Sequence, residues 1–367
     1  MHRFAAFSRR LAAPTILALL LAGCAAAPAS MLAADTANAA AMAGVVGADF
    51  NGVVLLQSSA TATPQIRAFG TANVERGAAT TIDTRFQIGS ISKWLTSVAV
   101  LRLVDRGVLQ LDVPIAAWLP QMTASGSTVT LRHLMSNTSG IPNDLSPALK
   151  SDPASVMQPM PMAQASMRFV GRAPAFTPGS QFDYVPTNWV IVGAILEKVT
   201  GKPFAAVLDD EVLRTAGAAS TGVPQAAFDS MPGAARAYGA SLPRTPKMSP
   251  HVNYVAASGT IYSTAADLAR LAHAVYETGL LSPAARAELS RINVPDESYA
   301  LGGRVLSIAL GGTNRMVASE SGVSGGYKSL LLYVIGEGKT VVILNNTDMQ
   351  QSTQAEMAKA LLARMYQ

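Results

Sequence analysis

Two patterns typical of β-hairpins lie near opposite ends of the chain, and they constrain its fold more than any other feature. Near the N-terminus, residues 45–57 and 65–74 are rich in β-forming residues and are separated by a short polar turn. Near the C-terminus, residues 329–335 and 339–344 flank a Gly-Glu-Gly turn. The chain between them is mainly helical in pattern. We therefore expect strands from both ends to join one antiparallel sheet.

Several segments show the apolar spacing of helices. Residues 90–106 have apolar side chains at helical intervals, and Gly107 follows them as a stop signal. Similar patterns cover residues 188–200, 263–277 and 354–365. Frequent Pro and Gly residues divide 112–180 into short pieces, of which 131–137 is helical in pattern. The expected fold class is therefore α/β (α+β), with flanking helices and a helical insert over about 112–260 within a domain of 45–367.

The first 23 residues have the pattern of a signal peptide. Residues 1–10 contain three Arg and no acidic residue, and residues 11–23 form an apolar run of 13. A membrane-spanning helix needs about 20 apolar residues, so this run fits a signal-peptide core better. Residues 24–44, rich in Ala, fit a tether.

The apolar run ends in Leu-Ala-Gly-Cys, which resembles the bacterial lipobox, whose cysteine receives a lipid. Cys24 is the only cysteine of the chain and stands at the lipidated position. The alternative is ordinary secretion with cleavage after Ala27 or Ala39. In both cases the protein is exported to the bacterial cell envelope and faces the periplasm. If Cys24 is lipidated, the lipid also anchors the protein to the membrane.

Charge and histidine placement exclude several classes of function. Removing the three arginines of the leader lowers the formal net charge from +5 to +2. This charge is too small to indicate a nucleic-acid-binding protein. The four histidines lack the spacing of metal ligands, and His133 fits a core position better than a catalytic base. No dinucleotide or phosphate-binding motif is present. The sequence therefore indicates no metal and no cofactor.

Ser90 and Lys93 form the strongest local signal for chemistry. They lie three residues apart at the start of the apolar helix, on one face, where the amine can reach the hydroxyl. A serine hydroxyl needs an adjacent base to become a nucleophile. A lysine can be that base only where its surroundings favour the neutral amine. Alone, this spacing also fits a helix cap followed by a solvated lysine.

Several segments in the same order raise the specificity of this signal. Residues 86–93, 105–114, 131–142 and 257–269 resemble motifs of the serine hydrolases built on the class C β-lactamase fold. That family includes DD-peptidases, D-amino-acid amidases and esterases, and the resemblance covers residues 45–366. It implies a β-lactamase/transpeptidase-like fold and catalysis through an acyl-enzyme.

Tyr184 matches the tyrosine of the family's Tyr-x-Asn motif, and the resemblance implies that it shuttles protons with Ser90 and Lys93. The alternative is a core tyrosine. Pro186 stands where the family has an asparagine whose amide helps hold the acyl side chain, and proline offers no such donor. Asn188 is two residues further on and is not assigned a role.

The third motif of the family, Lys-Thr-Gly or His-Thr-Gly, is matched by Glu320-Ser321-Gly322. The resemblance implies that these residues contact substrate, and that the backbone amides of Ser90 and Val323 bind the oxyanion. Glu320 puts a carboxyl group where the family has a cation. This anion at the pocket would repel a substrate carboxylate; the alternative is that Glu320 faces solvent.

Ser324 lies in a Gly-x-Ser-x-Gly pattern, which in α/β-hydrolases marks the nucleophile between a strand and a helix. A strand pattern follows here, so Ser324 is not expected to be the nucleophile.

We therefore expect an exported serine hydrolase acting on a small-molecule ester or amide. The first alternative is a β-lactamase or DD-peptidase acting on a β-lactam or a peptidoglycan peptide. An alternative of another class is a non-catalytic ligand-binding homologue. The reason to consider it is that Pro186 and Glu320 depart from the motifs of the catalytic family members.

Overall fold

The computed structural model describes residues 1, 42, 44–47, 49–124, 127–170, 172–249 and 252–367. Residues 2–23 of the expected signal peptide, and Cys24, lie outside these residues. Within the described ranges, no helix is both long and apolar enough to cross a bilayer.

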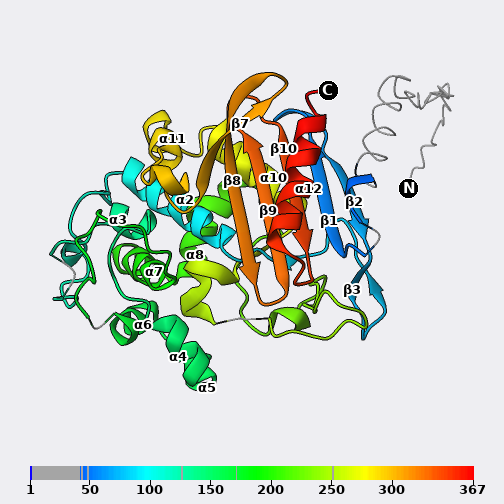
Figure 1. Ribbon diagram of the computed structural model, residues 1–367. Coiled ribbons are helices and arrows are strands. Elements are labelled where there is room, and N and C mark those ends of the chain that lie inside the picture. The colour runs from blue at the N-terminus through cyan, green and yellow to red at the C-terminus, as the bar shows by residue number, and fades with distance from the viewer. Residues whose placement is uncertain (2–41, 43, 48, 125–126, 171, 250–251) are drawn as a thin grey trace.

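A six-stranded antiparallel sheet in the order β2-β1-β10-β9-β8-β7 forms the centre of the fold (Figure 1). Strand β1 pairs with β10, so that Gly52 lies opposite Asn345. The expectation that both ends of the chain build one antiparallel sheet is confirmed. The strands are β1 (Gly52–Gln57), β2 (Gln65–Phe69), β3 (Thr71–Asn73), β4 (Ala78–Ala79), β5 (Phe86–Gln87), β6 (Tyr262–Ser263), β7 (Arg304–Leu310), β8 (Thr313–Ser324), β9 (Tyr327–Val334) and β10 (Thr340–Asn345).

Both faces of the sheet are covered by helices. Along β10, Val342 and Leu344 join the main core, whereas Val341 and Ile343 join a smaller core beneath α12. This alternation places α12 on one face and α2 and α10 on the other (Figure 1). The helices are α2 (Ile91–Asp105), α3 (Leu131–Met135), α4 (Leu145–Ser151), α5 (Pro153–Val156), α6 (Met162–Phe169), α7 (Thr187–Thr200), α8 (Phe204–Leu208), α9 (Arg214–Ala216), α10 (Ala265–Tyr276), α11 (Pro283–Ser290) and α12 (Gln351–Arg364).

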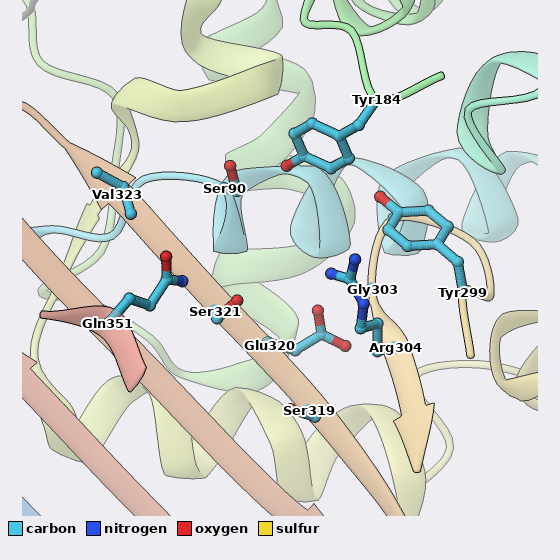
Figure 2. A pocket seen from close by; sticks show the side chains of 11 residues that line it. Ser90, Tyr184, Tyr299, Gly303, Arg304, Ser319, Glu320, Ser321, Val323 and Gln351 are labelled. Carbon is cyan, nitrogen blue, oxygen red and sulfur yellow. The ribbon is translucent and has the colours of Figure 1, made fainter. Parts of the chain in front are cut away.

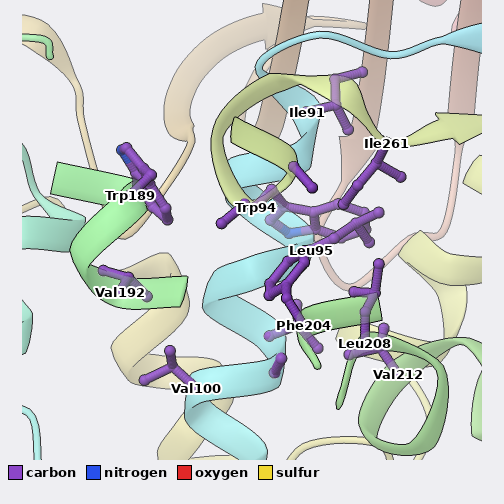
Figure 3. Close-up of a cluster of buried hydrophobic side chains, with 14 of the residues drawn as sticks. Ile91, Trp94, Leu95, Val100, Trp189, Val192, Phe204, Leu208, Val212 and Ile261 are labelled. Atoms are coloured by element: carbon purple, nitrogen blue, oxygen red, sulfur yellow. The ribbon is translucent and has the colours of Figure 1, made fainter. Parts of the chain in front are cut away.

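Helix α2 is the central element between the sheet and the helical region. Of its 15 residues, 12 are buried, which is the pattern of a helix surrounded by protein on all sides. Trp94 and Leu95 of α2 pack near Phe204 of α8, while Trp189 of α7 lies on another side (Figure 3). Ser90, at the start of α2, is thus attached to one of the most buried elements of the molecule.

The main differences from the sequence expectations concern short or paired elements. The first strand begins at Gly52 instead of residue 45. Strands β7 and β8 form a hairpin that periodicity did not reveal. A single-turn π-helix, η5 (Ala256–Thr260), precedes β6 and packs against α2.

Candidate active site

Ser90 lies where the chain passes from the short strand β5 into α2. Strand β5 pairs with β6, and the amide of Ile88 donates a hydrogen bond of 2.9 Å to the carbonyl of Ile261. Ser90 itself has helical backbone angles, φ −64° and ψ −10°. Its amide therefore belongs to the N-terminal end of the helix, where backbone N–H groups are free to face a ligand.

Lys93 contacts Ser90 directly. Its Nζ donates to Ser90 Oγ at 3.1 Å and to the carbonyl oxygen of Ser258 at 2.6 Å. The lysine side chain is buried, with 3% of its surface exposed. These contacts hold the amine against the hydroxyl that the sequence predicts as the nucleophile.

The Ser258 carbonyl is held in place by α2 itself. Thr96 Oγ1 donates to the carbonyl of Ala257 at 2.9 Å, and the amide of Ile261 donates to Ser92 Oγ at 3.2 Å. Polar side chains on one face of α2 thus fix the π-helical turn η5, which is an irregularity often found at functional sites. Ser258 was not assigned a role from the sequence, although it falls within the motif at 257–269.

Tyr184 is carried by a loop that precedes α7, and the segment after α3 holds this loop. Gly179 and Asp183 donate backbone hydrogen bonds of 2.7 and 2.8 Å to the carbonyls of Thr138 and Asn137. Asn188 is buried and supports the same segment, since it accepts from Ser139 Oγ at 2.6 Å. Asn188 therefore positions the tyrosine loop and does not replace the asparagine missing at Pro186.

The Tyr184 side chain covers Lys93. The Lys93 Nζ lies 4.9 Å from the centroid of the tyrosine ring, and the ring meets the edge of Tyr299 at 6.2 Å between centroids. Figure 2 shows the Tyr184 hydroxyl directed toward Ser90. The structure therefore brings together the three residues predicted to be catalytic.

Two glycines let strand β8 approach the Ser90 segment closely. A Cβ added to Gly89 would lie 2.4 Å from the amide nitrogen of Val323, and one added to Gly322 would lie 1.9 Å from the carbonyl oxygen of Ile88. Ser329 Oγ also donates to the Ile88 carbonyl at 2.6 Å. The backbone of Val323 is thus beside the N-terminus of α2, as an oxyanion hole made by Ser90 and Val323 requires.

A polar cavity of about 300 Å³ opens next to Ser90. Besides Ser90, it is lined by Tyr184, Tyr299, Gly302, Gly303, Arg304, Ser319, Glu320, Ser321, Val323 and Gln351 (Figure 2). The sequence had pointed to Glu320, Ser321 and Val323 in this lining. It did not point to Tyr299, in the loop before β7, to Arg304 of β7 or to Gln351 of α12, because none of them lies in a motif that the sequence analysis singled out.

Glu320 lines this cavity and does not face solvent, because only 3% of its surface is exposed. Burial raises the pKa of its carboxyl to about 8, against a smaller opposing effect of Arg304. At pH 7 the group is mainly the neutral acid. The expectation of an anion at the pocket therefore has to be corrected: with its pKa raised to about 8 by burial, Glu320 is an anion mainly above about pH 8.

A second cavity of about 400 Å³ lies on another side of Ser90. It shares Ser90, Tyr184 and Val323 with the polar cavity, and Pro186 borders it. Its further walls are mostly apolar and include residues of α4 and α5 together with Met248, Val252, Tyr254 and Val255.

The other residues considered from the sequence have structural contacts. Ser324 is buried and donates to Gln87 Oε1 at 2.8 Å, and the strand β9 follows it, so the helix of a nucleophile elbow is missing. His133 Nδ1 accepts from the Thr130 amide at 3.3 Å as part of the N-terminal cap of α3.

Comparisons with known proteins agree with this geometry. The Beta-lactamase family model matches residues 39–364. The chain is 36% identical over 163 residues to Esterase EstB of Burkholderia gladioli, an alignment covering 41% of each protein. It is 28% identical over 314 residues to Penicillin-binding protein 4 of Amycolatopsis lactamdurans, covering 79% of each. The penicillin-binding protein of Bacillus halodurans has the same fold, with a TM-score of 0.74 at 24% identity over 88% of this chain and 98% of that one.

The match to the family model extends over nearly the whole described domain, including both strands of the N-terminal hairpin and helix α12. The chain therefore belongs to the Beta-lactamase family and is a serine hydrolase of the β-lactamase, DD-peptidase and esterase type.

Proposed function

We propose that the protein hydrolyses an ester or an amide, with Ser90 as the nucleophile. The observation that carries this proposal is the hydrogen bond of 3.1 Å between Lys93 Nζ and Ser90 Oγ at the edge of two cavities. As Ser90 Oγ bonds to the substrate carbonyl carbon, Lys93 and Tyr184 take up its proton and pass it to the leaving group. The amides of Ser90 and Val323 bind the oxyanion.

Water completes the reaction by attacking the acyl-enzyme. Its oxygen bonds to the acyl carbon, its proton passes to the Lys93–Tyr184 pair, and the bond to Ser90 Oγ breaks. The serine regains its proton and the free acid leaves. Each step needs only the groups already placed around Ser90, so no cofactor enters the proposed mechanism.

An ester or a neutral or cationic amide fits the site better than a penicillin. Pro186 offers no donor to an acyl amide, and position 320 carries no cation for a substrate carboxylate. The partial match to Esterase EstB supports this preference. The match to Penicillin-binding protein 4 keeps β-lactams and peptidoglycan peptides as the alternative substrates.

We also propose that the protein is exported and anchored by a lipid on Cys24. The support comes from the sequence, in which an apolar run of 13 residues ends at the single cysteine. An enzyme held this way would face the periplasm and meet substrates of the cell envelope.

A fluorophosphonate probe tests the catalytic proposal. The probe should form an adduct on the peptide that contains Ser90, and Ser90→Ala should lose both the adduct and the turnover of p-nitrophenyl acetate. A full adduct in Ser90→Ala would overturn the assignment. An unlabelled wild-type protein without turnover of esters, D-amino-acid amides or nitrocefin would instead support a non-catalytic binding protein.

A further inference from the structure

The side chain of Tyr184 is exposed, because it projects from a loop into the space between the two cavities. Contacts of its ring set its direction. Lys93 Nζ lies 4.9 Å from the ring centroid, and the Tyr299 ring meets it at 82° between planes and 6.2 Å between centroids (Figure 2). An exposed side chain on a loop has several rotamers open to it, so a proton-transfer group placed there needs a rigid neighbour.

Tyr299 is rigidly held. Only 1% of its surface is exposed. The Phe182 ring, from the loop before α7, packs against it at 5.3 Å between centroids, and the Arg304 guanidinium lies 5.4 Å from its ring centroid. Its backbone amide donates to the Val294 carbonyl at 3.1 Å, and its own carbonyl accepts from the Asn293 amide at 2.8 Å. The Tyr299 ring is therefore fixed by contacts on both its side chain and its backbone.

Two strained backbone positions adjoin this tyrosine. In the part of the chain that the structure describes, Asn137 and Ser298 are the residues other than glycine with a positive φ, +55° and +50°. Ser298 directly precedes Tyr299, and the Asn137 side chain faces the Tyr299 hydroxyl. The Asn137 carbonyl also accepts from the amide of Asp183, the neighbour of Tyr184. Such strain costs free energy and is concentrated at functional sites.

We propose that Tyr299 is a positioning residue for catalysis, whose ring holds the Tyr184 side chain with its hydroxyl directed toward Ser90. This inference rests on the proposed function of Ser90, Lys93 and Tyr184. Tyr299 forms and breaks no bond in the reaction. It acts through its edge-to-face contact with Tyr184, a geometry that aromatic pairs favour.

The Tyr299 hydroxyl is not a second proton-transfer group. Burial raises its pKa well above the ordinary value of a tyrosine, and the Asn137 side chain opposes this effect only in part. The hydroxyl therefore keeps its proton throughout the reaction. For this reason the role of Tyr299 depends on the ring, and the proton of Ser90 passes through Lys93 and Tyr184 alone.

Two substitutions separate the ring from the hydroxyl. Tyr299→Phe keeps the ring and should leave kcat for p-nitrophenyl acetate within about twofold of the wild type. Tyr299→Leu removes the ring and should lower kcat by about 10- to 100-fold, the scale on which a misplaced group slows a reaction, while KM changes by about twofold or less. The rate of fluorophosphonate labelling should fall in parallel with kcat.

Tyr238→Leu is the matched control for the loss of a buried ring. Tyr238 is also fully buried, but its hydroxyl donates to Glu75 and it lines neither cavity beside Ser90. This variant should lower the melting temperature and leave kcat unchanged. A structural role of Tyr299 would produce the same result, whereas a positioning role predicts a fall in kcat for the folded enzyme.

A double variant tests whether Tyr299 acts through Tyr184. Adding Tyr299→Leu to Tyr184→Phe should slow fluorophosphonate labelling no further than Tyr184→Phe does alone, because the group that Tyr299 positions is already gone. Losses that multiply would show that Tyr299 acts independently of Tyr184 and would overturn the proposal.

Ser298 offers a test that leaves every side chain of the site in place, and it applies even if Tyr299→Leu does not fold. Ser298→Gly accepts the positive φ and should keep wild-type kcat. Ser298→Val resists it, so the backbone of Tyr299 should shift and kcat should fall by about tenfold or more. Equal kcat values in both variants would contradict the proposal.

The remaining outcomes separate this inference from the proposed function. A wild-type labelling rate in Tyr299→Leu, with slow labelling in Tyr184→Phe, would overturn the positioning role and leave the proposed function intact. A large loss in Tyr299→Phe would overturn the role of the ring and assign the effect to the hydroxyl. Wild-type labelling in both Tyr184→Phe and Tyr299→Leu would show that the proposed proton route itself has failed, and the positioning role with it.

Discussion

Gly89 and Val323 meet backbone to backbone, since a Cβ added to Gly89 would lie 2.4 Å from the Val323 amide nitrogen and 2.7 Å from its carbonyl oxygen. Gly89 precedes the proposed nucleophile, and Val323 supplies the second proposed oxyanion donor. The spacing of the two amides is thus set by a contact that leaves no room for any side chain at residue 89.

Gly89→Ala should lower kcat by about 10²–10³-fold, the cost of losing an oxyanion donor, because Val323 must move away from the Ser90 amide. Gly107→Ala is the matched control. Gly107 also has a positive φ, +70° against +53° for Gly89, but a Cβ there meets nothing within 4 Å. Steady-state kinetics on p-nitrophenyl acetate with thermal melts check this. An equal loss of activity in both variants would mean that backbone strain, and not the Val323 contact, is responsible.

Lys93→Ala and Tyr184→Phe should each slow acylation by about 10²–10⁴-fold, the range for loss of a proton-transfer group. Tyr184 is 39% exposed, so its variant should fold normally. Tyr366→Phe removes a hydroxyl that bonds to Glu337 near the C-terminus and is the control. The rate of fluorophosphonate labelling measures nucleophilic attack by Ser90, the step for which the proton-transfer groups are needed. Wild-type labelling in Tyr184→Phe would remove Tyr184 from the mechanism.

Two hairpins of the sheet, β1–β2 and β9–β10, could be predicted from the sequence because their signals are local. Residues 329–344 contain two apolar runs around a Gly-Glu-Gly turn, and they form β9 and β10 as expected. Strand β7 was not predicted, because it lies at the edge of the sheet and several of its residues are exposed or half-buried. Its pairing with β8 comes from the tertiary structure and leaves a weak local pattern.

The candidate site was predicted in part. Ser90, Lys93, Tyr184 and Val323 were identified from ordered motifs, and the structure brings them together. The protonation of Glu320 could not be predicted, because it depends on a segment from another part of the chain. The backbone of Gly303 covers the carboxyl group so closely that a Cβ on this glycine would lie 2.0 Å from Oε2.

Cys24→Ser should leave the protein unprocessed or release it into the soluble fraction, because attachment of the lipid needs the thiol. Cell fractionation with mass spectrometry of the mature N-terminus measures this outcome. Wild-type protein found wholly in the soluble periplasm, without lipid and cleaved after Ala27 or Ala39, would contradict the anchor and support ordinary secretion.

Glu320 should make the stability of the protein fall as the pH rises. Its pKa is about 8 in the folded protein, against an ordinary value of 4.5. At pH values between these two, the native state keeps a proton that the unfolded chain has lost. The free energy of unfolding should therefore fall by about 1.4 kcal/mol per pH unit between about pH 5 and 8 on account of this group. Glu320→Gln should remove this slope in urea unfolding, whereas the surface variant Glu356→Gln should keep it. A constant difference between Glu320→Gln and wild type across this range would contradict the raised pKa.

The same carboxyl group should make substrate selectivity depend on pH. Near pH 7 the neutral Glu320 does not repel a substrate carboxylate, but above about pH 8 its anion, at ~4 Å, would disfavour one by about 1–4 kcal/mol. The ratio of nitrocefin to p-nitrophenyl acetate turnover should then drop by roughly tenfold between pH 7 and 9, since about 1.4 kcal/mol is one decade. Glu320→Gln should hold the ratio constant, and Glu320→Lys should raise it at both pH values. A wild-type ratio that does not change with pH would mean that the substrate carboxylate lies away from Glu320, so that Pro186 alone would account for any discrimination against β-lactams.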